Sequence, residues 1–140
     1  MDTTEFLIRL ITATFAGLII GFERQWHHKE TGLKTNMLVA TGAAAFVLLS
    51  IKVSDTAPNI DVTRITAQVV MGVGFLGAGV IFREGPNVHG LNSAATIWCS
   101  AAIGCIAASG YFIEALICTF LVIIVNTAIE PVDRWLRNRK

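Results

Sequence analysis

Ile65–Phe82 reads ITAQVVMGVGFLGAGVIF and contains no charged residue over 18 positions. A helix of about 20 apolar residues crosses the roughly 30 Å hydrocarbon core of a membrane. Each glycine in a soluble helix costs about 1 kcal/mol, whereas small residues in a membrane let neighbouring helices approach closely. This stretch holds four of them, Gly72, Gly74, Gly77 and Gly79. We therefore predict that it is the central packing helix of a small membrane bundle.

The same glycines match G-x-G-x-x-G, a pattern of dinucleotide-binding proteins, at Gly72, Gly74 and Gly77. That motif requires a preceding strand and an acidic residue about 20 positions further on. In this chain Thr96 and apolar neighbours, and no acidic residue, stand about 20 positions further on. The glycines are therefore assigned to helix packing rather than to nucleotide binding.

The composition indicates an integral membrane protein with a single domain over residues 1–140. Of these residues 54% are hydrophobic and only 15% are charged, whereas a soluble domain has about 25% charged residues. Asp2 and Glu5 precede the first apolar run. A removable signal peptide has a basic region there, so we expect this run to remain as a helix.

Four further apolar stretches complete an all-α bundle of about five transmembrane helices. We expect the five helices at about 5–22, 37–51, 65–82, 92–109 and 111–129, with a polar hairpin at 83–90 between the third and the fourth. Short polar residues stand where helix caps are needed. The candidate caps are Asp2 or Thr3, Thr35 or Asn36, Asp61 or Thr63, and Asn92 or Ser93.

Small residues spaced four apart mark the expected contact faces of these helices. One stripe lies in the first helix and another in the fourth. The glycines assigned to helix packing are Gly17, Gly21, Gly42, Gly72, Gly74, Gly77, Gly79 and Gly104. Because several such faces exist in a short chain, we expect a homo-oligomer.

Lysine and arginine predict the orientation, because these residues are enriched on the cytoplasmic side. Eight of the eleven fall in the loop after the first helix, in the hairpin and in the C-terminal tail, and three fall on the other side. The N-terminus is therefore expected outside and the C-terminus inside. The basic tail consists of Arg134, Arg137, Arg139 and Lys140.

Polar residues gather at the predicted cytoplasmic end. Glu23 follows the first helix and Arg83 follows the third, so Glu23 could form an ion pair with Arg83, or with Arg24 of a neighbouring subunit. Alternatively each is an ordinary helix-end anchor. His27, His28 and His89 lie on the same side, but their spacing resembles no dedicated metal site. The available carboxylates are few for a strong magnesium site. We predict no bound metal and no cofactor.

Other chemistry is not indicated. The three cysteines, Cys99, Cys105 and Cys118, lie in apolar segments without C-x-x-C spacing, so we interpret them as small buried hydrophobic residues. No nucleophile and base are paired, so an enzyme is not expected. No acidic residue lies at mid-membrane, and proton-coupled transporters normally need a buried ionisable relay there.

Four segments closely resemble the MgtC/SapB family of bacterial inner-membrane proteins: 21–26, 32–44, 67–81 and 83–104. The resemblance covers almost the whole chain. Longer members carry a cytoplasmic domain after the last helix, whereas the given sequence stops at Lys140, so functions that depend on that domain are not carried over from the resemblance. Lys34 stands where the family commonly has arginine. By position, the polar signature of the family falls on Glu23, Arg24, Thr35, Asn36, Gln68, Arg83, Asn92 and Trp98.

The resemblance implies a multi-pass protein of the bacterial inner membrane that is linked to magnesium limitation and to virulence. It further implies a regulator that binds membrane partners such as the ATP synthase, a P-type magnesium pump or small membrane peptides. Nucleic acid is not expected among its partners. The alternative hypothesis is an oligomeric channel or transporter for Mg²⁺ or another ion, in which Gln68 and Asn92 would influence the flux.

Overall fold

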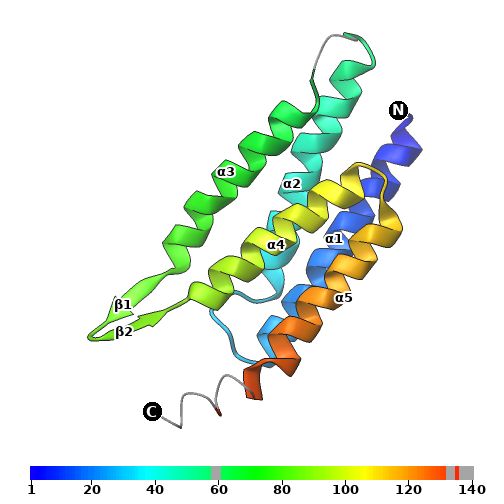
Figure 1. Cartoon of the computed structure of the whole chain (residues 1–140). Helices are drawn as coiled ribbons and strands as arrows, with labels where there is room; N and C mark the ends of the chain where they lie inside the picture. Colours follow the sequence, from blue (N-terminus) through cyan, green and yellow to red (C-terminus); the bar gives the residue numbers. More distant parts are fainter. Residues whose placement is uncertain (58–60, 132–134, 136–140) are drawn as a thin grey trace.

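The computed structural model describes residues 1–57, 61–131 and 135. This part of the chain folds into five helices and one short hairpin, which confirms the expected all-α bundle (Figure 1). Helices α1 to α4 are long and apolar enough to cross a membrane, and α5, with 17 residues, is slightly shorter. The elements are α1 Thr3–Trp26, α2 Leu33–Ser54, α3 Thr63–Val80, β1 Phe82–Glu84, β2 Asn87–His89, α4 Leu91–Ala108 and α5 Phe112–Ala128.

The first helix begins after one of its expected caps, and the next three begin earlier than expected. The Asp2 carboxylate accepts a hydrogen bond from the Thr3 N–H at 2.5 Å. The expected cap of α2 at Thr35 or Asn36 is wrong: α2 begins after Gly32, and the Asn36 amide turns back to the Gly32 carbonyl. The expected cap of α3 at Asp61 or Thr63 is wrong, because α3 begins after Val62, although the Asp61 carboxylate accepts a hydrogen bond from the Thr63 N–H at 2.9 Å. The expected cap of α4 at Asn92 or Ser93 is also wrong, because α4 begins after Gly90 in a left-handed conformation, with φ 82°.

Helix α4 is the centre of the bundle, and the prediction that the glycine-rich helix takes this place is wrong. Eleven residues of α4 are buried, whereas only Val73 and Gly77 are buried in α3. Helix α4 contacts each of the other four helices. Figure 1 shows α3 on the outer side of α2 and α4, away from α1 and α5. Alanine, serine and glycine make up most of the buried part of α4, so neighbouring helices can approach it closely there.

The predicted packing glycines divide into two groups. A Cβ at Gly17 would lie 2.6 Å from the Asn36 carbonyl oxygen, one at Gly21 would lie 2.6 Å from Leu33 Cα, and one at Gly104 would overlap the Ala40 carbonyl. Those three glycines therefore bring α2 against α1 and α4. A Cβ at Gly77 would make ordinary contact with Ala94 at 3.5 Å. A Cβ would meet nothing within 4 Å at Gly42, Gly72, Gly74 or Gly79.

The polar hairpin is confirmed as two antiparallel strands, with Phe82 paired to His89 and Glu84 to Asn87. Gly85 takes the positive φ of 60° that the turn needs. The rings of Phe82 and His89 stack with their centroids 5.3 Å apart. Because the hairpin connects α3 to α4, it holds the start of α4 at the same end of the bundle as the last turn of α1 (Figure 1).

Arg9 joins the first part of α1 to the end of α4. Its Nη1 donates to the carbonyl oxygen of Ala108 at 2.8 Å, and its Nη2 pairs with Glu5. The guanidinium therefore satisfies one of the carbonyls that are left free at the end of α4. The predicted basic tail, 134 and 137–140, and Pro58 in the loop before α3 lie outside the described residues.

Candidate functional site: a buried polar cluster at one end of the bundle

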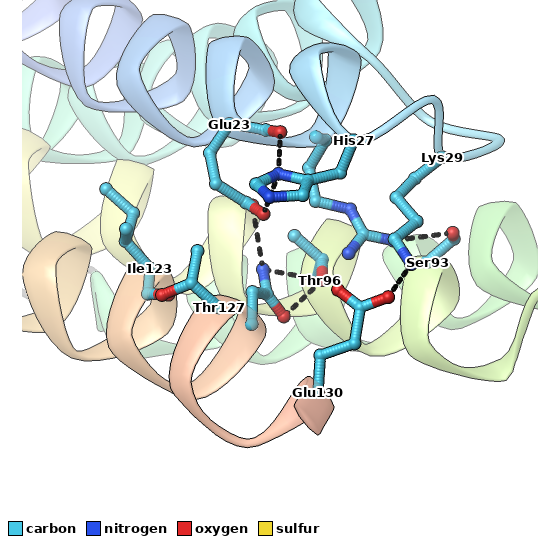
Figure 2. Close-up of polar contacts among 10 residues, drawn as sticks. Glu23, His27, Lys29, Ser93, Thr96, Ile123, Thr127 and Glu130 are labelled. Carbon is cyan, nitrogen blue, oxygen red and sulfur yellow. Dashed lines mark hydrogen bonds and ion pairs between the residues drawn. The ribbon is translucent and has the colours of Figure 1, made fainter. Parts of the chain in front are cut away.

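Glu23 lies buried in the last turn of α1, with only 8% of the residue exposed. Its Oε1 lies 3.1 Å from His27 Nδ1 one turn later, and its Oε2 accepts a hydrogen bond from Asn126 Nδ2 of α5 at 3.3 Å. Figure 2 shows Glu23 between His27 and the residues of α4 and α5. The carboxylate thus joins the end of α1 to the end of α5.

Asn126 continues this network to α4. Thr96 Oγ1 lies 3.5 Å from Asn126 Oδ1 and 3.4 Å from Asn126 Nδ2, and it also donates to the Asn92 carbonyl at 2.9 Å. Both side chains are buried. A polar side chain inside a membrane bundle needs such partners, because the surrounding lipid offers none.

Arg24 is completely buried beside Glu23. Its Nη2 donates to Ser93 Oγ at 2.8 Å, and Ser93 donates in turn to Glu30 Oε2 at 2.5 Å. The Ser93 hydrogen bond holds the pKa of the Glu30 carboxyl below its usual value, with help from its own backbone N–H. The carboxylates that interact electrostatically with Arg24 are Glu23, Glu30 and Glu130.

A pocket of about 540 Å³ opens beside Arg24. Lys29 Nζ pairs with Glu130 Oε1 at 2.8 Å at its wall, which ties the loop after α1 to the end of α5 (Figure 2). We call this cavity the Arg24 pocket. Its lining is Arg24, Lys29, Glu30, Val88, His89, Gly90, Leu91, Asn92, Ser93, Val125, Asn126, Ile129 and Glu130.

Some residues of the predicted polar signature meet in this cluster. Glu23 and Arg24 are buried in it, and Asn92 lines the Arg24 pocket. Asn36 is buried nearer the centre, where its Oδ1 accepts a hydrogen bond from Ser100 Oγ at 2.8 Å. Thr35 lies half-buried next to it in α2.

The other signature residues lie elsewhere. Gln68 is exposed on α3, and Trp98 is half-exposed on α4. Arg83 is exposed in the hairpin, where its Nε donates to the Gly85 carbonyl at 2.9 Å. The suggested Glu23–Arg83 pair therefore does not form within the described chain; the partners of Glu23 are His27 and Asn126.

Sequence reasoning missed the contribution of α5 and of the loop after α1. Asn126 from α5, Glu130 just after α5 and Lys29 from the loop complete the cluster. Asn126 carried a usable signal, because a polar residue in an otherwise apolar span is costly and tends to be functional or paired. Among the described residues, no group of three or more histidine, cysteine, aspartate or glutamate side chains is placed to hold a metal ion.

Comparisons with known proteins agree on one family. Residues 10–135 match the MgtC family. The chain is 51% identical to Protein MgtC of Salmonella typhimurium over 86% of this chain and 51% of that protein. It is 52% identical to Protein MgtC of Brucella abortus over 87% of this chain and 50% of that protein.

A third relative matches the chain over nearly its full length. This Synechocystis protein, itself uncharacterized, is 45% identical over 99% of this chain and 58% of its own length. The chain thus spans between half and three fifths of the relatives that it matches. No solved structure matches it. The family match and these identities show that the chain belongs to the MgtC family.

Proposed function

We propose that this protein is a regulator that acts by binding another membrane protein laterally through the exposed face of α3. The observation that carries the proposal is the open space beside the α3 glycines. A Cβ at Gly72, Gly74 or Gly79 would meet nothing within 4 Å. Within one chain these glycines therefore lack the close neighbour that small residues in membrane helices accommodate.

The bulky residues of α3 support the same interpretation. Phe75 is 82% exposed and Met71 is 71% exposed, so they stand beside the glycines without covering them. Large side chains next to small ones offer ridges and a groove to a second helix. A transmembrane helix of a partner protein fits this surface, which we call the α3 face: Gln68, Met71, Gly72, Phe75 and Gly79.

Gln68 adds a polar element to the α3 face. It lies one turn before Gly72, its residue is exposed, and its side chain makes no hydrogen bond with any described residue. An amide exposed to hydrocarbon lacks the partners that water would give it. A hydrogen-bonding side chain of a partner helix would supply them and would make the contact specific.

The family resemblance and, for the orientation, the distribution of lysine and arginine supply a setting for this proposal. We place the protein in the bacterial inner membrane, with the N-terminus outside and the Arg24 pocket facing the cytoplasm, and link it to magnesium limitation and virulence. The candidate partners are the ATP synthase, a P-type magnesium pump and small membrane peptides. Self-association into a homo-oligomer is the competing use of the α3 face.

Site-specific photocrosslinking in native membranes tests the proposal. A photoreactive residue replaces Met71 or Phe75 on the α3 face, and the control carries it at Phe120, which is 57% exposed on α5. We expect a discrete crosslinked partner protein from both α3 positions and none from position 120. Crosslinks to lipid or to other copies of this chain alone would contradict the proposal.

An oligomeric ion channel or transporter is the second candidate function, and the exposure of Gln68 favours it. Several copies could bring this amide and the open glycines of α3 around a shared polar path. The purified protein in liposomes would then conduct Mg²⁺ or another ion, and Gln68→Leu would change the flux. A folded preparation that conducts no ion removes this candidate.

A further inference from the structure

Two nitrogens of the Arg24 guanidinium lack a hydrogen-bond partner in the described part of the chain. The residue is completely buried, and its Nη2 donates a hydrogen bond to Ser93 Oγ at 2.8 Å. Nε and Nη1 are both buried and find no acceptor among the described residues. A buried charged donor without an acceptor is costly, so the guanidinium has unused capacity for an anionic ligand.

The start of α4 provides further donors on the wall of the same pocket. Gly90 precedes the 18-residue helix in a left-handed conformation, and no side chain caps its first turn. The first backbone N–H groups of a helix have no partner within the helix, and the helix dipole makes this end attractive to phosphate and other anions. Gly90, Leu91, Asn92 and Ser93 all line the pocket beside Arg24.

The remaining lining sets limits on the ligand. Lys29 adds a second cation, while Glu30 and Glu130 add two carboxylates that are engaged by Ser93 and Lys29 respectively. These four charges of the lining balance, and Glu23 outside the lining adds a third carboxylate that interacts with Arg24. Selectivity for an anion therefore has to come from the directed N–H groups of Arg24 and α4. Apolar side chains, including Val125 and Ile129 of the α5 end, form another part of the wall.

We propose that the Arg24 pocket binds a phosphate group, held by Arg24, by Lys29 and by the backbone N–H groups at the start of α4. Two oxygens of a phosphate group can accept from one edge of a guanidinium at once, here from Nη1 or Nε together with the second N–H of Nη2. Because Nε and Nη1 are closed off from water, binding includes a shift of the side chains at the pocket wall. The same chemistry is offered by a phospholipid headgroup, at the end of the membrane helices, and by free phosphate. This proposal does not depend on the α3 face.

Thermal unfolding of the purified full chain in phosphate-free detergent tests the proposal, because a ligand that binds the folded state raises the unfolding temperature saturably. The two probes are inorganic phosphate and short-chain phosphatidylglycerol. Sodium chloride at equal ionic strength and a diacylglycerol without phosphate are the controls. A rise with inorganic phosphate identifies the free ion as a sufficient ligand, and a rise with phosphatidylglycerol alone identifies a lipid headgroup. If neither probe produces a saturable rise beyond its control, the proposal is wrong.

Variants locate the binding. Arg24→Gln should abolish the response, and Lys29→Gln should weaken the apparent affinity on the order of tenfold, the loss of about one charged hydrogen bond. Lys34→Gln, exposed at the same end and outside the pocket lining, should leave it unchanged. A response that survives in Arg24→Gln would overturn the proposal.

If Arg24→Gln fails to fold, Glu130→Gln provides a second test of phosphate binding in the Arg24 pocket. It removes a carboxylate from the pocket and releases Lys29 from its ion pair, so phosphate should bind several-fold more tightly in this variant. Unchanged or weaker binding in Glu130→Gln would show that the pocket does not recognise an anion and would contradict the proposal.

Discussion

Asn36 of α2 and Ser100 of α4 form a hydrogen bond at 2.8 Å in the completely buried centre of the bundle. The other end of the Asn36 side chain donates to the Gly32 carbonyl at 2.9 Å. One amide therefore fixes the start of its own helix and the position of the central helix.

Asn36→Ala should destabilise the fold by about 1–2 kcal/mol, because it leaves the Ser100 hydroxyl without its acceptor and removes the side-chain donor of the Gly32 carbonyl, which keeps only the backbone N–H of residue 36. The double variant with Ser100→Ala should show a coupling energy of roughly 0.5–2 kcal/mol. Reversible unfolding in detergent measures both values. Thr35→Ala, next to Asn36 and half-buried, is the control and should be nearly silent. Strictly additive losses would contradict the pairing.

Gly104→Ala should destabilise the chain, because its new Cβ would overlap the Ala40 carbonyl and push α2 away from α4. Such overpacking costs typically 1–3 kcal/mol. The matched control is Gly74→Ala, where a Cβ meets nothing within 4 Å and the better helix former should stabilise the monomer by up to about 1 kcal/mol. The unfolding midpoint of monomeric protein in detergent measures the difference. Equal effects of the two substitutions would mean that α4 is not held by this contact.

The stability of the protein should depend on pH through Glu30. The Ser93 hydroxyl holds the folded-state pKa of this carboxyl below its usual value of 4.5. The bonded carboxylate therefore adds stability that is fully present above the unfolded-state pKa and is lost as the pH falls through the folded-state pKa. We expect Glu30→Gln to be less stable than the wild type at pH 7, and the difference to shrink as the pH falls below about 4.5.

Unfolding titrations between neutral and acidic pH check this expectation. Glu84→Gln is the control, because it removes a carboxylate from an exposed position in the hairpin. A stability difference for Glu30→Gln that stays constant or grows toward acid would contradict the proposed role of the Ser93 hydrogen bond.

The helices and the hairpin were predictable from the sequence, because they follow from local properties. Long uncharged runs and the turn at Gly85 act over a few residues, and neither depends on distant parts of the chain. Helix ends were harder. The amide of Asn36 was expected to cap α2, but the chain turns it toward Gly32 and Ser100, a choice that depends on where α4 lies.

The centre of the bundle was predicted wrongly for a physical reason. Four glycines indicate that α3 can be approached closely, but they do not indicate whether the neighbour belongs to the same chain. Helix α4 carried a more direct signal, because small residues occupy most of its circumference and only one side, with Leu91 and Trp98, is exposed. A helix that is apolar all round is typically buried, and α4 is the most buried helix of this bundle.

Part of the candidate site could be predicted and part could not. Glu23 and Arg24 stand at the end of an apolar run, which marks them as residues at the membrane boundary. Their partners Asn126 and Ser93 are 103 and 69 positions away along the chain, respectively. Such pairings depend on the packing of α1, α4 and α5, which no local pattern specifies.

Co-purification of a partner protein with glycine variants tests the central proposal, the lateral contact at the α3 face, most directly. Gly72→Leu fills open space on α3, and Gly42→Leu fills open space on α2 as the matched control. The account predicts that both variants fold like the wild type in detergent, that Gly42→Leu retains the partner from native membranes, and that Gly72→Leu loses it. Retention of the partner by folded Gly72→Leu would contradict the account.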